Sequence, residues 1–199
     1  MFEIKTTHIF DEFIDCILHK NSIEASWKLI CLESHEWELY SKQRYKYVDY
    51  LDKYLNHLIG GEEEFEKEWD DLDPEESFPA SCEPSKLIKK VIKSIEDEIS
   101  ENEDKELFKK DTSFLREVLN SFDEDYLILI NLEEYKRSPP FNVPSTIAHE
   151  VIHIVDLCKG EKHKGKWIDK EGLKYAKECI DYVKDDIMKN HFKIWHSLI

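Results

Sequence analysis

The chain has 199 residues and a formal net charge of −16, and 41% of its residues are hydrophobic and 36% are charged. This hydrophobic share is enough for a packed core, which excludes a wholly disordered chain. Residues 141–199 carry ten Lys and nine Asp or Glu, so residues 1–140 carry a net charge of −17, which argues against broad binding to nucleic-acid phosphates there.

The cysteines and the N-terminus bear on the cellular compartment. The chain has five cysteines, and no two of them have C-x-x-C spacing. This argues against a disulfide framework or a zinc ribbon, and we expect reduced thiols in a cytoplasmic protein. The N-terminal residues lack the apolar core of a signal peptide, and no stretch approaches about 18 uncharged apolar residues. We therefore expect neither a membrane span nor a membrane partner.

Most of the first 120 residues have apolar side chains at helical spacing, while Gly and Pro are scarce. We expect helices over residues 8–20, 22–58 (one helix or two), 86–100 and 103–121. Gly60 and Gly61 should end the second of these, because glycine readily adopts the left-handed conformation. Residues 62–83 are strongly acidic and contain Pro74 and Pro79, which is typical of a loop or linker.

The chain changes character at residues 126–130, a short continuous apolar run that is typical of a buried strand. Three prolines indicate an extended loop over residues 136–144. Ser145 is a candidate N-cap for a helix that runs to about Lys159 and stops at Gly160. A loop over about 161–167 and a helix over about 168–196 complete the chain.

These elements predict an α+β fold that is mostly helical, with a short sheet. We expect an N-terminal helical region at residues 1–60 and an acidic linker at residues 61–84. Residues 85–199 should form the core region that carries the chemistry described next.

Three residues of the expected helix that follows Ser145 form an H-E-x-x-H sequence: His149, Glu150 and His153. Side chains four residues apart lie on one helix face, so the two imidazoles can hold one zinc ion. Glu150 projects beside the first histidine, in the position of a general base toward a zinc-activated water. Residues 146–155 are otherwise uncharged, which indicates a buried helix, and a metal ion would supply the partners that buried polar groups need.

The sequence offers several candidates for the third zinc ligand. A catalytic zinc ion usually has three protein ligands and one water. His163 is a candidate, because a turn after the glycine-ended helix would bring it back toward the motif. Glu171 and Glu178 on the last expected helix are alternatives, as are Asp156 and Asp169.

The H-E-x-x-H frame, the glycine-ended helix and the following His-Lys-Gly-Lys-Trp sequence together resemble the SprT-like zinc metallopeptidases. In that family a histidine follows the motif past a loop, with an aromatic residue four positions later, and Trp167 matches that aromatic residue. The resemblance covers about residues 126–180. It implies a zincin-like core within residues 85–199, a zinc ion held by His149, His153 and His163, Glu150 as the base, and a role near DNA-bound proteins. The chain departs from the family at Lys164, where glycine is usual, and in having no C-terminal zinc ribbon.

The function that these residues predict is zinc-dependent hydrolysis, with Glu150 as the general base. A protein or peptide substrate is implied by the resemblance rather than by the residues themselves. The oxyanion donor stays open among Tyr126, Tyr135 and Tyr175. One alternative is a non-catalytic acidic binding or inhibitor protein that sequesters a partner or mimics nucleic acid and keeps a metal-stabilised helix. Another is a structural helical protein in which the motif is accidental.

Overall fold

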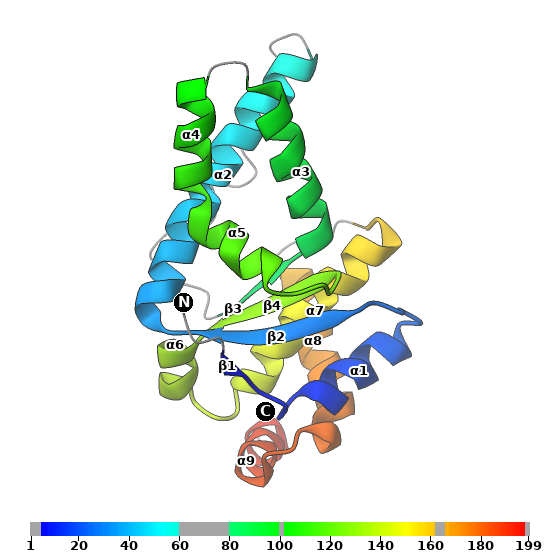
Figure 1. Cartoon of the computed structure of the whole chain (residues 1–199). Coiled ribbons are helices and arrows are strands. Elements are labelled where there is room, and N and C mark those ends of the chain that lie inside the picture. The colour runs from blue at the N-terminus through cyan, green and yellow to red at the C-terminus, as the bar shows by residue number, and fades with distance from the viewer. Residues whose placement is uncertain (1–4, 60–79, 100–101, 162–165, 198–199) are drawn as a thin grey trace. The chain divides into compact units, whose positions relative to one another are not determined.

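The computed structural model describes residues 5–59, 80–99, 102–161 and 166–197. Over these residues the fold is α+β and mostly helical, which confirms the fold class expected from the sequence (Figure 1). The chain forms two compact units. The first comprises Met1–Ser34, Pro79–Pro84 and Glu124–Ile199, and the second comprises His35–Phe78 and Ser85–Asp123.

The first unit is built on a mixed sheet with the strand order β1-β2-β4-β3. Its strands are β1 (Lys5–Thr6), β2 (Trp27–Leu32), β3 (Ala80–Glu83) and β4 (Tyr126–Asn131). The central strands β2 and β4 are parallel, with Ile30 opposite Leu129, and the edge strands β1 and β3 are antiparallel to their neighbours. Strand β4 confirms the strand expected at residues 126–130.

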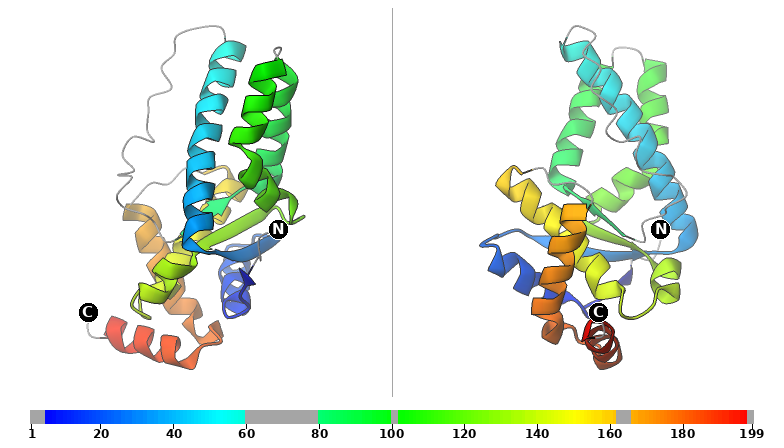
Figure 2. Two further views of the ribbon diagram at one scale, coloured as in Figure 1. Left: turned by 60° about the vertical axis from the view of Figure 1, so that its left-hand side comes forward. Right: turned by 180° about the vertical axis from the view of Figure 1, so that it is seen from behind.

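Helices cover one face of this sheet. They are α1 (Asp11–Lys20), α6 (Leu132–Arg137), α7 (Val143–Lys159), α8 (Lys166–Cys179) and α9 (Asp186–Ser197), with a 3-10 turn at Ile180–Tyr182. Alternate strand residues, among them Leu29, Ile128 and Ile130, share one core with buried side chains of α1, α7 and α8, because successive strand side chains point to opposite faces. The second view in Figure 2 shows α7 and α8 packed against each other over the sheet.

The second unit contains helices and no strand among its described residues. It contains α2 (Ser34–Ile59), α3 (Ser85–Glu98), α4 (Asn102–Asp111) and α5 (Ser113–Asn120). Helix α5 is capped from another helix: the buried Gln43 of α2 accepts hydrogen bonds from the backbone N–H groups of Phe114 (2.7 Å) and Leu115 (3.0 Å). The hydroxyl of Thr112, which precedes α5, instead donates to the carbonyl of Phe108 at 2.7 Å. Gln43 therefore satisfies two N–H groups that a helix start leaves without intrahelical partners.

The expectation of helix throughout residues 22–58 is wrong, because residues 27–32 form β2. Leu29–Leu32 are all buried. A strand in the interior of a sheet can consist of consecutive apolar residues, and such a run also fits the spacing of apolar residues in a helix. The loop expected at residues 62–83 is likewise wrong at its end, where residues 80–83 form β3. This strand has only four residues, too few to show an alternating pattern.

The other expected boundaries differ less from those of the structure. The helix expected from Ser145 begins at Val143, with Pro144 in its first turn, where a missing N–H costs nothing. Its end is confirmed: Gly160 has φ +66°, the left-handed conformation of a helix C-cap. The helix expected over 168–196 is interrupted after Cys179 by the 3-10 turn and resumes at Asp186. The expected stop at residues 60–61 lies outside the described residues.

The expected regions 1–60, 61–84 and 85–199 do not coincide with the two compact units. Helix α1 and strands β1 to β3 belong with residues 124–199, whereas residues 85–123 belong to the helical unit. The expectation of reduced thiols also needs correction, since Cys16 and Cys179 form a disulfide with their Cα atoms 6.2 Å apart. The two cysteines are 163 residues apart in the sequence, so no local spacing could reveal the pair.

None of the described helices is both long enough and apolar enough to cross a bilayer.

Candidate metal centre

The two motif histidines lie on one face of α7 with their rings close together. The Nε2 atoms of His149 and His153 are 3.1 Å apart, and the ring centroids are 4.9 Å apart. Two nitrogen ligands of a tetrahedral zinc ion stand about 3.3 Å apart, given zinc–nitrogen distances of about 2.0–2.1 Å. The pair therefore fits two ligands of one ion. The same distance also suits an N–H···N hydrogen bond between the rings.

The other ring nitrogen of His149 has a carboxylate partner. Nδ1 of His149 lies 2.9 Å from Oδ1 of Asp169 on α8. If the Nδ1–H donates to this carboxylate, the ring adopts the tautomer that leaves the Nε2 lone pair available to a metal ion. Asp169 is one of the alternatives for the third ligand. Its contact with Nδ1 suits it to orient the His149 ring and not to bind the same ion as His149.

A glycine allows α8 to approach the motif this closely. A Cβ atom on Gly172 would lie 3.0 Å from the backbone N of His149 and 3.1 Å from its Cα. Because the backbone of a packed helix cannot yield as a flexible side chain can, a larger residue would push the two helices apart. Asp169 lies three residues before Gly172, about one turn of the same helix, so the close approach also brings its carboxylate to His149.

Sequence reasoning missed the role of this glycine. The signal was present, since an isolated glycine within a helical pattern often has a packing reason.

The environment of His153 favours the neutral, metal-binding form of its ring. Burial lowers the pKa of His153, the neighbouring His149 lowers it further, and Asp156 and Asp169 oppose the shift. A histidine must be deprotonated to ligate a metal ion. The burial of His153 therefore prepares it for that role.

Glu150, the candidate general base, is almost fully buried on α7, as is Asp156 two turns later. Carboxylates are seldom buried unless they have partners or a chemical role. Glu150 follows His149 directly in the chain, so its carboxylate projects from the helix about 100° around from that ring. This is the arrangement expected of an H-E-x-x-H site.

Among the other third-ligand candidates, neither Glu171 nor Glu178 completes a metal-binding group with the two histidines. Glu171 pairs with Lys174 at 2.9 Å, and Glu178 pairs with Lys20 at 3.0 Å. His163 lies outside the described residues. Within the described parts of the chain, no group of three or more His, Cys, Asp or Glu side chains is arranged to hold a metal ion. The described site thus offers two nitrogen ligands, and the third ligand remains a prediction.

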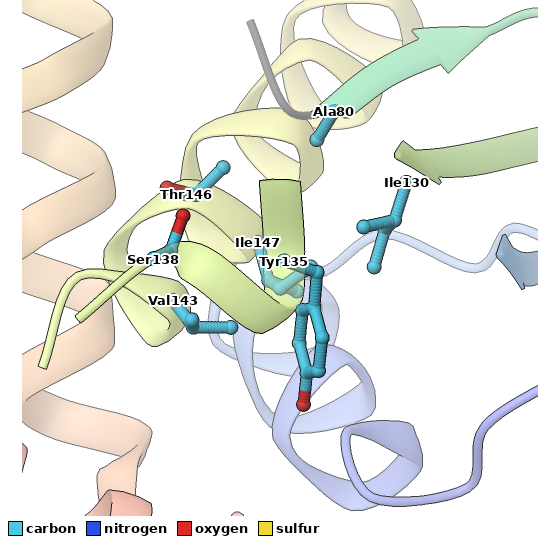
Figure 3. A pocket seen from close by; sticks show the side chains of 7 residues that line it. All are labelled: Ala80, Ile130, Tyr135, Ser138, Val143, Thr146 and Ile147. Carbon is cyan, nitrogen blue, oxygen red and sulfur yellow. The ribbon is translucent and has the colours of Figure 1, made fainter. Parts of the chain in front are cut away.

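A small pocket, shown in Figure 3, opens beside α7 at Val143, Thr146 and Ile147, which precede His149 in the helix. It is lined by Ala80, Ile130, Tyr135, Ser138, Val143, Thr146 and Ile147. Its wall is mostly apolar, and Figure 3 shows the Tyr135 hydroxyl pointing away from Ser138 and Thr146. The pocket lies on the N-terminal side of the motif, on the helix that carries it.

The three tyrosines considered as oxyanion donors have different surroundings. Burial, with Asp185 and Cys31, raises the pKa of Tyr135 above its ordinary value. The Tyr126 hydroxyl lies 3.3 Å from Sγ of Cys158, and Tyr175 donates to Asn21 at 3.0 Å. Tyr126 and Tyr175 are thus engaged with groups other than the motif residues.

No protein-family model, curated protein or solved structure matches the chain. The resemblance to the SprT-like metallopeptidases therefore rests on the motif residues alone, and the geometry around His149 and His153 carries the argument about function.

Proposed function

We propose that the protein is a zinc-dependent hydrolase, most specifically a metallopeptidase of the H-E-x-x-H type. The observation that carries the proposal is the pair of Nε2 atoms 3.1 Å apart, with Asp169 on the far nitrogen of His149. His149 and His153 would hold the ion. His163 is the proposed third ligand, from its position in the motif and the resemblance.

Each residue has a defined part in this proposal. The chemistry supplied by a bound zinc ion is polarisation of the scissile carbonyl and a lower pKa of water. Asp169 orients the His149 ring through Nδ1, and the burial of His153 keeps that ring neutral. Glu150 accepts a proton from the attacking water and later passes it to the leaving amine.

The substrate class follows from the resemblance. The compartment follows from the number and spacing of the cysteines, and the Cys16–Cys179 disulfide fits a cytoplasmic protein when it forms transiently. We propose a protein or peptide substrate, and a cytoplasmic protein. The resemblance further suggests substrates among DNA-bound proteins. The net charge of −17 on residues 1–140 would favour contact with basic proteins over contact with DNA itself.

Metal content tests the proposal first. Wild type and the variants His149→Ala, His163→Ala and Glu171→Ala would be purified without added metal and measured by mass spectrometry. We expect about one zinc ion per chain in wild type and in Glu171→Ala, from the one-ion site that the motif forms, and loss of zinc in the two histidine variants. His191→Ala is the matched control, because His191 is exposed on α9. Wild type that binds no zinc, even when zinc is supplied, would refute the proposal.

Catalysis is tested separately with Glu150→Gln, which keeps the shape of the side chain and removes the base. We expect this variant to retain zinc and to lose hydrolysis of an unfolded protein such as casein. Hydrolysis at the wild-type rate in Glu150→Gln would show that Glu150 is not the base. Zinc binding without hydrolysis in wild type, under conditions where unfolded protein is offered, would instead favour the acidic binding or inhibitor protein.

A further inference from the structure

The C-terminal end of α1 and the C-terminal half of α8 are joined by three neighbouring links, which we name the α1–α8 junction. The links are the Cys16–Cys179 disulfide, the Lys20–Glu178 ion pair at 3.0 Å and the hydrogen bond from the Tyr175 hydroxyl to Asn21 Oδ1 at 3.0 Å. All three join the last turns of one helix to the last turns of the other. The junction therefore sets where this end of α8 lies.

The disulfide is the strongest of the three links. Lys20 and Glu178 are each about two-fifths exposed, and ion pairs that water reaches contribute little. The side-chain oxygen Oδ1 of Asn21 is shared, since Lys159 also donates to it at 3.3 Å. The disulfide is covalent, and Cys179 is fully buried. Loss of this bond would leave the junction to two weak polar contacts and to side-chain packing.

Helix α8 connects the junction to the candidate metal centre. Cys179 lies ten residues after Asp169, about 15 Å along the helix axis. The Asp169 side chain is 65% exposed, so its contact with His149 is held by the position of α8 and not by surrounding side chains. The junction fixes one end of α8, and Gly172 brings the middle of α8 into close contact with the backbone of His149. Together these two constraints would keep Asp169 at 2.9 Å from His149.

We propose that Cys16 and Cys179 form a thiol–disulfide switch that controls how tightly the candidate centre retains zinc; this regulation rests on the proposed function. In the oxidised form the disulfide holds α8 on α1 and keeps Asp169 against His149. In the reduced form α8 is free to move at the junction, and the orientation of His149 loosens.

The chemistry is ordinary thiol–disulfide exchange. One cysteine thiolate attacks oxidised glutathione and forms a mixed disulfide, and the second thiolate displaces glutathione from it. Overall the two cysteine thiols lose two electrons and two protons, and two molecules of reduced glutathione are released. Lasting disulfides are rare in the cytoplasm, where those that form are usually transient and redox-sensing. The proposed compartment therefore suits a switch better than a permanent structural bond.

Hydrogen exchange of the metal-free wild type tests the junction without any variant. The protein would be oxidised with oxidised glutathione or reduced with a phosphine, and the state of the cysteines would be checked by alkylation and mass. We expect reduction to raise the exchange rates of residues 166–179 about tenfold, because opening of α8 becomes easier. Helix α3, which belongs to the other compact unit, serves as the internal reference and should not change.

Zinc affinity, measured by competition with a chromophoric chelator, tests the regulation. We expect the oxidised form to bind zinc about tenfold more tightly, within the 10- to 100-fold effect that loss of an outer partner of a ligand has on affinity. Asp169→Asn should bind zinc weakly in both forms and show little redox difference, because the switch acts through Asp169. Cys16→Ser should behave as the reduced form under both conditions, and Cys158→Ser, an exposed thiol outside the junction, should respond as wild type does.

The two measurements separate this proposal from the proposed function. Equal exchange of α8 in both forms would overturn the switch, whatever the zinc affinity. Altered exchange with equal zinc affinity would overturn the regulation and leave zinc binding intact. If neither form bound zinc, the proposed function and the regulation of zinc would both fall, and the exchange data would still show whether the disulfide fixes α8.

Discussion

Replacing Gly172 by alanine tests the helix contact on which the candidate metal centre depends. The added Cβ would lie 3.0 Å from the backbone N of His149, whereas unstrained contacts of this kind are about 3.5 Å or longer. Because both partners are helix backbone, α8 must move away from α7 by about 0.5 Å to accept the methyl group. Such a shift would lengthen the Asp169–His149 contact from 2.9 Å toward the limit of a hydrogen bond.

Two opposing effects decide the stability of Gly172→Ala. Alanine in a helix interior is favoured over glycine by about 1 kcal/mol. Overpacking of a close contact costs about 1–3 kcal/mol. We therefore expect a net loss of about 0–2 kcal/mol in the free energy of unfolding, together with about a tenfold loss in zinc affinity from the displaced Asp169.

Urea denaturation measures the first quantity, and competition with a chelator measures the second. Lys170→Ala, an exposed change on the same helix, is the matched control and should leave both unchanged. A Gly172→Ala protein that is about 1 kcal/mol more stable than wild type and binds zinc equally well would refute the reasoning, because alanine would then have met no obstacle.

Three further predictions concern other parts of the chain. Gln43→Leu should lower the free energy of unfolding by about 1–3 kcal/mol in urea denaturation, because the N–H groups of Phe114 and Leu115 lose their acceptor; a change below about 0.5 kcal/mol would contradict this capping role. Burial lowers the pKa of His196 below 6.5 in the folded protein, and Lys177 lowers it further. Below pH 6.5 the unfolded chain therefore binds this proton more readily than the folded protein. The stabilising contribution of neutral His196 is complete above pH 6.5 and is lost as the pH falls through the lower pKa of the folded state. His196→Phe should therefore flatten the dependence of the melting temperature on pH below 6.5, and an unchanged pH profile would count against it. Trp195→Ala should destabilise the first unit and raise hydrogen exchange in α9, because the Trp195 ring stacks on Phe141 with the centroids 4.1 Å apart; unchanged exchange in α9 would show that the stack does not hold this helix.

Local information in the sequence predicted well the helix that carries the H-E-x-x-H motif. The spacing of His149 and His153, the apolar residues around them and the glycine at position 160 all act within a few residues of one another. The structure accordingly has a helix that ends at Lys159, with both rings on one face. The strand at residues 126–130 was predictable for the same reason, since a short apolar run bounded by acidic residues suits a buried strand.

The features that escaped prediction depend on residues far apart in the chain. Residues 27–32 became a strand because β4, about a hundred residues later, lies parallel beside them. The Asp169–His149 contact and the Cys16–Cys179 disulfide likewise join different helices. No local pattern marks such pairs, because each partner alone fits an ordinary surface or core position.

The order of the strands has a consequence for how the protein folds during synthesis. Strand β4 is central in the sheet, yet β2 and β3, its two neighbours, are both made before it, and the helical unit is made around β3. Helical segments with nearby contacts fold quickly, whereas strands that are distant in the sequence pair slowly. A nascent chain that has reached residue 123 thus contains the whole helical unit, whereas β2 can pair only with β1 and β3 has no partner strand. Until β4 emerges, these strands expose hydrogen-bonding edges, and this interval is when the chain is most prone to associate with other chains or to need a chaperone.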